Sequence, residues 1–248
     1  GKSILMLGGN ATVKNYSVSR DGSKILARLE PEGAKFESKD GELWLHDISA
    51  ATTQRLTNNK YREANPKLAP DNKRFAFIAT VNEQGEGYYE DNLFVQTVGA
   101  VQPRLLLADK PMEILEFEWD KSGNGIFIIG NIGVRNELFH LTLSENGATD
   151  DRLKRLTTGD HSIDDWSYNV VTGQHIAIVD SAVNPGEVHV TSQASTSFEP
   201  VTAEYANLTK RFLLPEQVAF TWQAKDGQAL EGILAYPVGY DLKSRYPL

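Results

Sequence analysis

The stretch Ser122-Gly123-Asn124-Gly125-Ile126-Phe127-Ile128-Ile129 joins a tight-turn dipeptide to a short apolar run, and this combination recurs along the chain. The other turn dipeptides, spaced about 50 residues apart, are Asp21-Gly22, Asp71-Asn72 and Thr172-Gly173. The apolar runs that follow them are Ile25-Leu26-Ala27, Phe75-Ala76-Phe77-Ile78 and Ile176-Ala177-Ile178-Val179. Short runs of this kind, bounded by turns, are typical of strands buried on both faces. The chain therefore contains a fourfold β repeat.

Each repeat holds further strand-like segments on both sides of the apolar run. A later strand is centred on Leu43-Trp44-Leu45, Leu93-Phe94-Val95, Leu138-Phe139-His140 and Val188-His189-Val190, and an outer one ends in Leu-Thr or a similar pair. Four strands in about 40–50 residues indicate a β-propeller blade. The predicted blades span residues 14–58, 64–108, 113–158 and 163–203, within a propeller region of residues 1–210. The Asp-Gly and Asn-type turns are expected to supply the positive φ that two-residue hairpins demand.

Four blades are few for a closed ring that carries a further domain. Either more blades lie upstream, or the array is open. Because uncovered blade faces are apolar, we expect self-association through them.

Composition excludes several classes of partner and site. The chain has 248 residues, no cysteine and a net charge of −8. Without cysteine there are no disulfides, thiolate zinc sites or cysteine nucleophile. Lysine and arginine are scattered, which argues against a nucleic-acid partner, and no apolar run approaches the roughly 18 residues of a membrane span. The sequence does not decide whether the protein is located in the bacterial cytoplasm or the periplasm.

The stretch Asn82–Asp91, between two strands of the second blade, is the first candidate site. It carries Glu86, Tyr88, Tyr89 and Glu90. These side chains could gate a pore and hold a cationic peptide terminus, because loops on rigid scaffolds often carry function. The alternative is an ordinary solvated hairpin loop.

Gly159–Asp165 is a second candidate, since His161 lies there among three aspartates. Such a set could bind a divalent metal, but the same residues link two blades, and we favour that structural interpretation. No metal site and no cofactor are predicted. Glu204 and Tyr205 lie where the array gives way to the C-terminal segment and are expected, with Trp222, to contact a further domain.

The last segment, residues 211–248, departs from the repeat. The pattern Phe220-x-Trp222-x-x-x-Asp226-Gly227-x-x-Leu230-x-Gly232-x-Leu234-x-x-Pro237 predicts two strands joined by an Asp-Gly turn. With the blades, it resembles the prolyl oligopeptidase family of serine peptidases, in particular the acylaminoacyl peptidase and dipeptidyl aminopeptidase branch. Leu156-Thr157-x-Gly159-Asp160-His161 is similar to a blade junction of this branch.

The resemblance implies an N-terminal propeller joined to an α/β-hydrolase domain, of which this hairpin is the first edge. The parent enzyme is then expected to hydrolyse short peptides through an acyl-enzyme, with the propeller screening substrates by size. No catalytic residue can be assigned in the chain, because it has no Gly-x-Ser-x-Gly elbow and the family's triad lies beyond the matched segment. The chain alone is therefore expected to be inactive.

Two alternatives remain. One is a free-standing propeller that binds proteins, of the periplasmic Tol-system type, which has no evident use for an apolar hairpin after its last blade. The other is a metal-dependent propeller lyase or lactonase, which needs convergent acids and histidines on the axis; the chain has five histidines.

Overall fold

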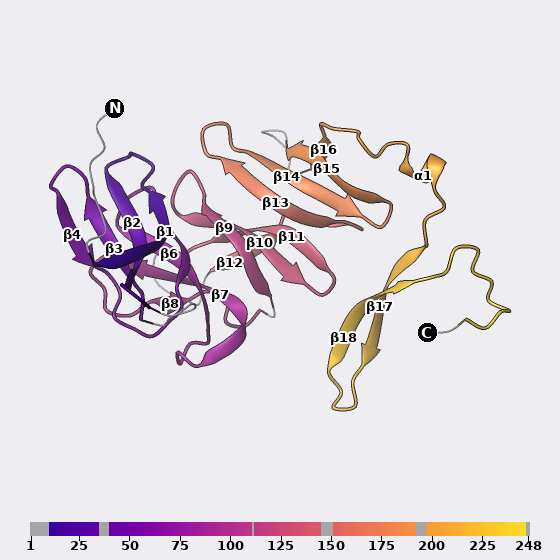
Figure 1. The fold of residues 1–248 in the computed structure, drawn as a ribbon, viewed down its shortest axis with the longest axis horizontal. Helices are drawn as coiled ribbons and strands as arrows, with labels where there is room; N and C mark the ends of the chain where they lie inside the picture. The colour runs from indigo at the N-terminus through magenta and orange to yellow at the C-terminus, as the bar shows by residue number, and fades with distance from the viewer. Residues whose placement is uncertain (1–9, 35–39, 111, 145–150, 192–196, 247–248) are drawn as a thin grey trace. The chain divides into compact units, whose positions relative to one another are not determined.

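The computed structural model describes residues 10–34, 40–110, 112–144, 151–191 and 197–246. These residues form four four-stranded antiparallel sheets, a two-stranded sheet and a single short helix (Figure 1). Within each large sheet the strands follow chain order, as they do in propeller blades. The predicted all-β propeller fold is thus confirmed. No helix among the described residues has the length and hydropathy of a membrane-spanning segment.

The strands of the four blades have the following bounds. Blade one contains β1 (Ala11–Val18), β2 (Lys24–Pro31), β3 (Glu42–Asp47) and β4 (Thr52–Arg55). Blade two contains β5 (Ala64–Leu68), β6 (Arg74–Val81), β7 (Gly87–Thr97) and β8 (Arg104–Leu105). Blade three contains β9 (Glu113–Trp119), β10 (Gly125–Ile132), β11 (Arg135–Thr142) and β12 (Arg152–Arg155). Blade four contains β13 (Ser162–Asn169), β14 (Gln174–Ser181), β15 (Asn184–Thr191) and β16 (Phe198–Pro200).

The chain divides into two compact units. The first comprises Gly1–Ile128 with His140–Leu153, and the second Ile129–Phe139 with Lys154–Leu248. The division passes through blade three.

The core of the first unit is built from the apolar middle strands of blades one and two. Phe77 and Phe94 stack with their ring centroids 5.4 Å apart. The buried cluster consists of Leu26, Leu43, Leu45, Leu56, Phe75, Phe77, Ala79, Val81 and Phe94. Hydrogen bonds also tie successive inner strands: the Ser17 hydroxyl donates to the Pro66 carbonyl at 2.6 Å, and Trp119 Nε1 donates to the Lys67 carbonyl at 3.0 Å. Continuous apolar runs thus bury both faces of the middle strands, as expected for stacked blades.

The four predicted turns all contain a residue with positive φ. The φ values are 71° at Gly22, 57° at Asn72, 74° at Gly123 and 75° at Gly173. The expectation of two-residue hairpins is wrong, however, because the Ser19 amide bonds the Lys24 carbonyl across residues 20–23. Asp21 explains the wider turn in blade one, since its Oδ1 accepts hydrogen bonds from the Ser19 hydroxyl and the Ser23 amide.

The second unit ends in the predicted hairpin. After the helix α1 (Leu208–Arg211), strands β17 (Gln217–Gln223) and β18 (Ala229–Ala235) pair in antiparallel register. Gly227 has φ 87°, and the Ala224 amide bonds the Gln228 carbonyl at 2.8 Å to close the turn. Trp222 lies opposite Leu230, and Phe220 opposite Gly232, so these residues share one face of the hairpin.

Candidate functional site

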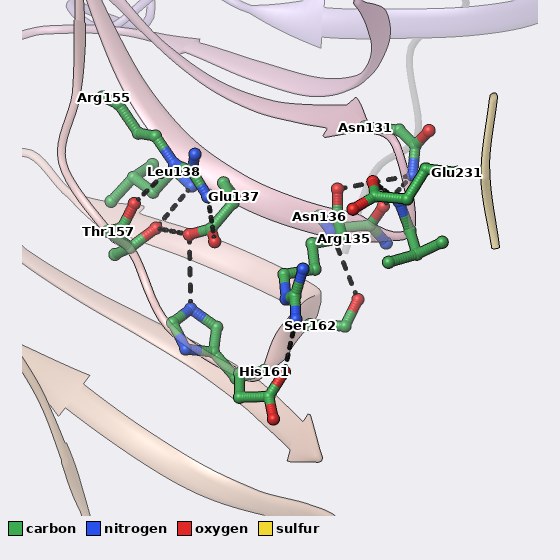
Figure 2. A network of polar contacts seen from close by, with 12 residues as sticks. Asn131, Arg135, Asn136, Glu137, Leu138, Arg155, Thr157, His161, Ser162 and Glu231 are labelled. Atoms are coloured by element: carbon green, nitrogen blue, oxygen red, sulfur yellow. Dashed lines mark hydrogen bonds and ion pairs between the residues drawn. The ribbon is translucent and has the colours of Figure 1, made fainter. Parts of the chain in front are cut away.

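A fully buried carboxylate, Glu137 of β11, is the centre of a polar network in the second unit (Figure 2). Arg155 Nη2 donates to Glu137 Oε1 at 2.6 Å, and the Thr157 hydroxyl donates to Oε2. His161 Nε2 lies 3.3 Å from the same Oε2 atom. Three side chains from the end of β12 and the β12–β13 connection therefore converge on one acid.

These neighbours decide the charge of Glu137. Burial raises its pKa, but the His161 side chain, the Thr157 hydroxyl and the Arg155 guanidinium outweigh burial and hold the pKa below its usual value. Glu137 is consequently a carboxylate at neutral pH.

Part of the arrangement around Glu137 recurs in blade one. Arg55 Nη2 donates to Glu42 Oε1 at 2.9 Å, and the Thr57 hydroxyl accepts the Leu43 amide at 2.8 Å. In blade three the Thr157 hydroxyl accepts the Leu138 amide at 2.9 Å in the same way. We call this set the Glu–Arg–Thr clamp: Glu42, Arg55 and Thr57 in blade one, and Glu137, Arg155 and Thr157 in blade three.

Blade four keeps part of the clamp. The Thr202 hydroxyl donates to Glu187 and accepts the Val188 amide at 3.0 Å. Since the clamp pairs the third strand with the chain leaving the outer strand, it is a structural part of the blade. Two contacts distinguish the clamp of blade three from that of blade one. The Thr157 hydroxyl donates to Glu137 itself, whereas the Thr57 hydroxyl donates to Glu63, and His161 contacts Glu137.

The corresponding connection of blade one holds an acid, Glu63, where blade three has His161. Glu63 is buried and accepts hydrogen bonds from the Thr57 hydroxyl at 3.1 Å and from Asn59 Nδ2 at 2.9 Å. Burial raises the pKa of Glu63 to about 7, and the negative charge of Glu42 adds to the rise.

A cleft of about 420 Å³ lies beside the His161 connection in the second unit. Its blade wall comes from the β10–β11 turn, the β12–β13 connection and the β14–β15 turn, and its opposite wall from the hairpin β17–β18. The lining residues are Val134, Arg135, Asp160, His161, Ser162, Asp180, Ser181, Ala182, Gln217, Val218, Ala219 and Ile233. Polar groups lie on the blade side and aliphatic side chains mainly on the hairpin side, which suits a small ligand with a polar end and an apolar body.

The ionisable groups of the cleft are partly paired. Arg135 Nη2 forms an ion pair with Asp160, and Asn136 Nδ2 donates to Asp164 Oδ1 at 3.3 Å. Burial and the negative charge of Asp164 raise the pKa of Asp180. The cleft thus combines one paired cation, Arg135, with two acids, Asp160 and Asp180.

The alternative of a metal site at Gly159–Asp165 gains no support. Asp160 pairs with Arg135, His161 contacts Glu137, and Asp164 accepts from Asn136, so these side chains have separate partners. In the described ranges no group of three or more His, Cys, Asp or Glu side chains is placed to hold a metal ion.

The predicted gating residues lie partly in a strand instead of a loop. The connection covers only Asn82–Glu86, because β7 begins at Gly87 and includes the positions of Tyr88, Tyr89 and Glu90. Glu86 is exposed, and its Oε2 accepts a hydrogen bond from Asn82 Nδ2 at 2.9 Å. Glu90 is exposed, whereas the side chains of Tyr88 and Tyr89 lie outside the described residues. Their gating role stays a prediction.

The three predicted interface residues are exposed in the chain. Glu204 and Tyr205 follow blade four, and the Tyr205 amide donates to Glu187 Oε1 at 2.7 Å. Trp222 stacks on Phe220 with the ring centroids 5.5 Å apart. Contact with a further domain remains a prediction for all three.

Sequence patterns alone missed the clamp and the residues that line the cleft. A usable signal was present, since Glu42, Glu137 and Glu187 each directly precede the apolar centre of a third strand. Glu231 was also missed, although it lies in the predicted hairpin. Its partner, the Val134 amide, is 97 positions away in sequence.

Solved structures show what the chain is similar to. No protein-family model matches it, and no curated protein is significantly similar in sequence. A puromycin-hydrolyzing peptidase from Mycobacterium tuberculosis matches with a TM-score of 0.65 at 12% identity, covering 91% of this chain and 34% of that protein. A puromycin hydrolase matches with a TM-score of 0.62 at 16% identity, covering 92% and 34%. TolB from Acinetobacter baumannii matches with a TM-score of 0.58 at 15% identity, covering 93% and 53%.

These likenesses show a propeller fold. The fold is shared with peptidases and with TolB, so it does not by itself assign an activity. The chain spans about a third of the length of the two peptidase structures and about half of TolB.

Proposed function

We propose that this chain is the propeller part of a serine peptidase of the prolyl oligopeptidase type. The parent enzyme hydrolyses short peptides through an acyl-enzyme, and β17–β18 is the first hairpin of its α/β-hydrolase domain. The similarity to a puromycin hydrolase and a puromycin-hydrolyzing peptidase supports this proposal at the level of the fold.

The observation that carries the proposal is the uncovered apolar face of the hairpin. Phe220 is 50% exposed, Trp222 42% and Leu230 37%, and all three lie on one face. The other face, with Ala219 and Ile233, lines the cleft. An isolated two-stranded hairpin is marginally stable in water, and a contiguous exposed apolar face marks an interaction surface. The hairpin is therefore suited to carry further strands of a second domain.

The two domains would have different roles in the parent enzyme. The chain holds no Gly-x-Ser-x-Gly elbow, so the nucleophile, its base and the oxyanion donors belong to the hydrolase domain. The propeller supplies one wall of the cleft through Arg135, Asp160 and Asp180. That wall limits the size of substrates and helps to orient them.

A free-standing binding module of the Tol type is the alternative, and the likeness to TolB supports it equally at the level of the fold. The two functions differ in what the apolar face of the hairpin contacts. In a binding module the face has no partner within the polypeptide, whereas in the peptidase the hydrolase sheet covers it.

The gene sequence downstream of codon 248 tests the proposal. We expect the reading frame to continue and to encode a Gly-x-Ser-x-Gly motif within a hydrolase-sized domain. A stop codon directly after Leu248, or a continuation without such a motif, contradicts the peptidase assignment and favours the binding module.

A further inference from the structure

The turn between β10 and β11 contacts the C-terminal hairpin through a hydrogen bond. The Val134 amide donates to Glu231 Oε2 at 3.1 Å. Glu231 belongs to β18 and lies on the hairpin face that also carries Ile233, a residue of the cleft wall. A charge-assisted bond to a backbone amide is stronger than a neutral one.

Gly133 makes this close approach feasible. A Cβ atom at position 133 would lie 1.8 Å from Glu231 Oε2, which is far inside van der Waals contact. The φ of Gly133 is 60°, in the left-handed region that favours glycine. Glycine at position 133 therefore permits the left-handed backbone conformation of the turn and leaves room for the Glu231 carboxylate.

The same turn is anchored on its other side to the start of blade four. Asn131 Nδ2 donates to Asn136 Oδ1 at 2.8 Å, which closes the turn. Asn136 donates from its amide to the Ser162 hydroxyl at 3.4 Å (Figure 2). Arg135 pairs with Asp160. The turn is thus fixed against the connection that forms the blade wall of the cleft.

We propose that Glu231 and the Gly133–Val134 turn form a latch that holds the hairpin on blade three and so sets the width of the cleft. The latch joins an element with an uncovered face to a turn that is braced on blade four. The latch is independent of the peptidase assignment, because all of its groups belong to the chain and no catalytic step is involved.

The absence of cysteine allows a direct measurement of cleft width. Ala182 and Ala219 lie on the blade wall and the hairpin wall of the cleft, respectively. Spin labels on Ala182→Cys and Ala219→Cys report the distance across the cleft by double electron–electron resonance. We expect a narrow distribution in the parent chain, a broader and longer one with Glu231→Ala, and a nearly unchanged one with Glu231→Gln, which keeps an acceptor oxygen. Lys225→Ala, at the exposed hairpin turn, is the matched control and should change nothing.

Hydrogen exchange at the Val134 amide gives an independent readout. Glu231→Ala should raise the exchange rate of this amide roughly tenfold or more, since it loses its charged acceptor. Gly133→Ala should open the cleft as Glu231→Ala does. In the Glu231→Ala background it should add little to the cleft width, because the clashing carboxylate is gone and only the backbone cost at φ 60° remains. Circular dichroism of each variant checks that the blades remain folded.

Two results would overturn the latch. One is an unchanged distance distribution and unchanged Val134 exchange in Glu231→Ala. The other is equal loosening by Lys225→Ala and Glu231→Ala, which would show general instability of the hairpin.

Discussion

Glu63 and His161 occupy corresponding connections in blades one and three, yet they place opposite kinds of titratable group beside a buried glutamate. Glu63 lies near Glu42, and its pKa is raised to about 7. His161 lies 3.3 Å from Glu137, whose pKa is held below its usual value. The stability of the blade-one junction therefore decreases as the pH rises, and the stability of the blade-three junction decreases as the pH falls.

The blade-one junction should lose stability as the pH rises. The folded chain holds the Glu63 proton more tightly than the unfolded chain does. The stabilisation that results is therefore fully present below about pH 4.5 and is lost as the pH rises to about 7. A rise from 4.5 to about 7 corresponds to about 3 kcal/mol. Glu63→Gln should remove this loss, so that its urea midpoint exceeds that of the parent chain at pH 8. Glu83→Gln, in an exposed loop, is the control; parallel pH profiles for Glu63→Gln and the parent chain would refute the assignment.

At the level of strands, the Glu–Arg–Thr clamp links the third strand of a blade to the residues that follow its outer strand. The Thr157 hydroxyl has two roles, as donor to Glu137 and as acceptor for the Leu138 amide. Thr57 accepts the Leu43 amide in the same way. Repetition of one polar device in separate blades indicates that it serves the fold and not a reaction.

Thr157→Val tests the clamp with almost no change in side-chain volume. The substitution leaves a buried carboxylate with one donor fewer and a buried amide without its acceptor. We expect a loss of about 1–3 kcal/mol in the free energy of unfolding. Thr158→Val, at the next and exposed position, should be close to neutral. Equal urea midpoints for the two variants would show that the clamp contributes nothing.

The exposed aromatic rings on the apolar face of the hairpin should contribute little to the stability of the blades. Replacing Phe220 and Trp222 by serine should leave the unfolding midpoint of the blades nearly unchanged, because both rings are substantially exposed. Binding of a dye that reports exposed apolar surface should fall in the same variant. Phe77→Ala, in the buried cluster, is the contrasting control and should cost about 3–5 kcal/mol. A large loss of stability in the hairpin variant would mean that its apolar face is already covered in the chain.

The sequence was sufficient for the repeat, the positive-φ turns and the hairpin, because each depends on a local pattern of apolar and turn residues. It was insufficient for the turn length, since Asp21 accepts local hydrogen bonds that widen the connection. The latch and the Glu137 network depend on groups that are distant in the chain, which periodicity does not report. The sequence offers a metal site or a blade linker for His161 and favours the linker, but its partner Glu137 lies in another strand and can be found only from the fold.

At the scale of the molecule, large apolar side chains of the blade strands are exposed among the described residues. Tyr16 and Val18 of β1 are 68% and 55% exposed, and Ile176 of β14 is 46% exposed. The hairpin adds a further uncovered face. Monomeric proteins rarely expose large contiguous apolar surfaces, and the hairpin face is one such surface.

The isolated 248-residue chain should therefore self-associate. Size-exclusion chromatography with light scattering is expected to show assemblies larger than the 27.5 kDa monomer, increasing with concentration. Ile176→Lys should shift the distribution toward monomer, whereas Val101→Lys, at an exposed loop position, should not. A monodisperse monomer at all concentrations would contradict the prediction.

The most direct test of the peptidase assignment is labelling with a fluorophosphonate, which reacts with activated serines. It compares the 248-residue chain with the product of its complete gene. We predict that only the complete product is labelled, at a serine C-terminal to Leu248, and that it hydrolyses aminoacyl or acylaminoacyl amides that the 248-residue chain leaves intact. Labelling of the 248-residue chain with turnover, or a complete product with neither label nor hydrolysis, would contradict the account.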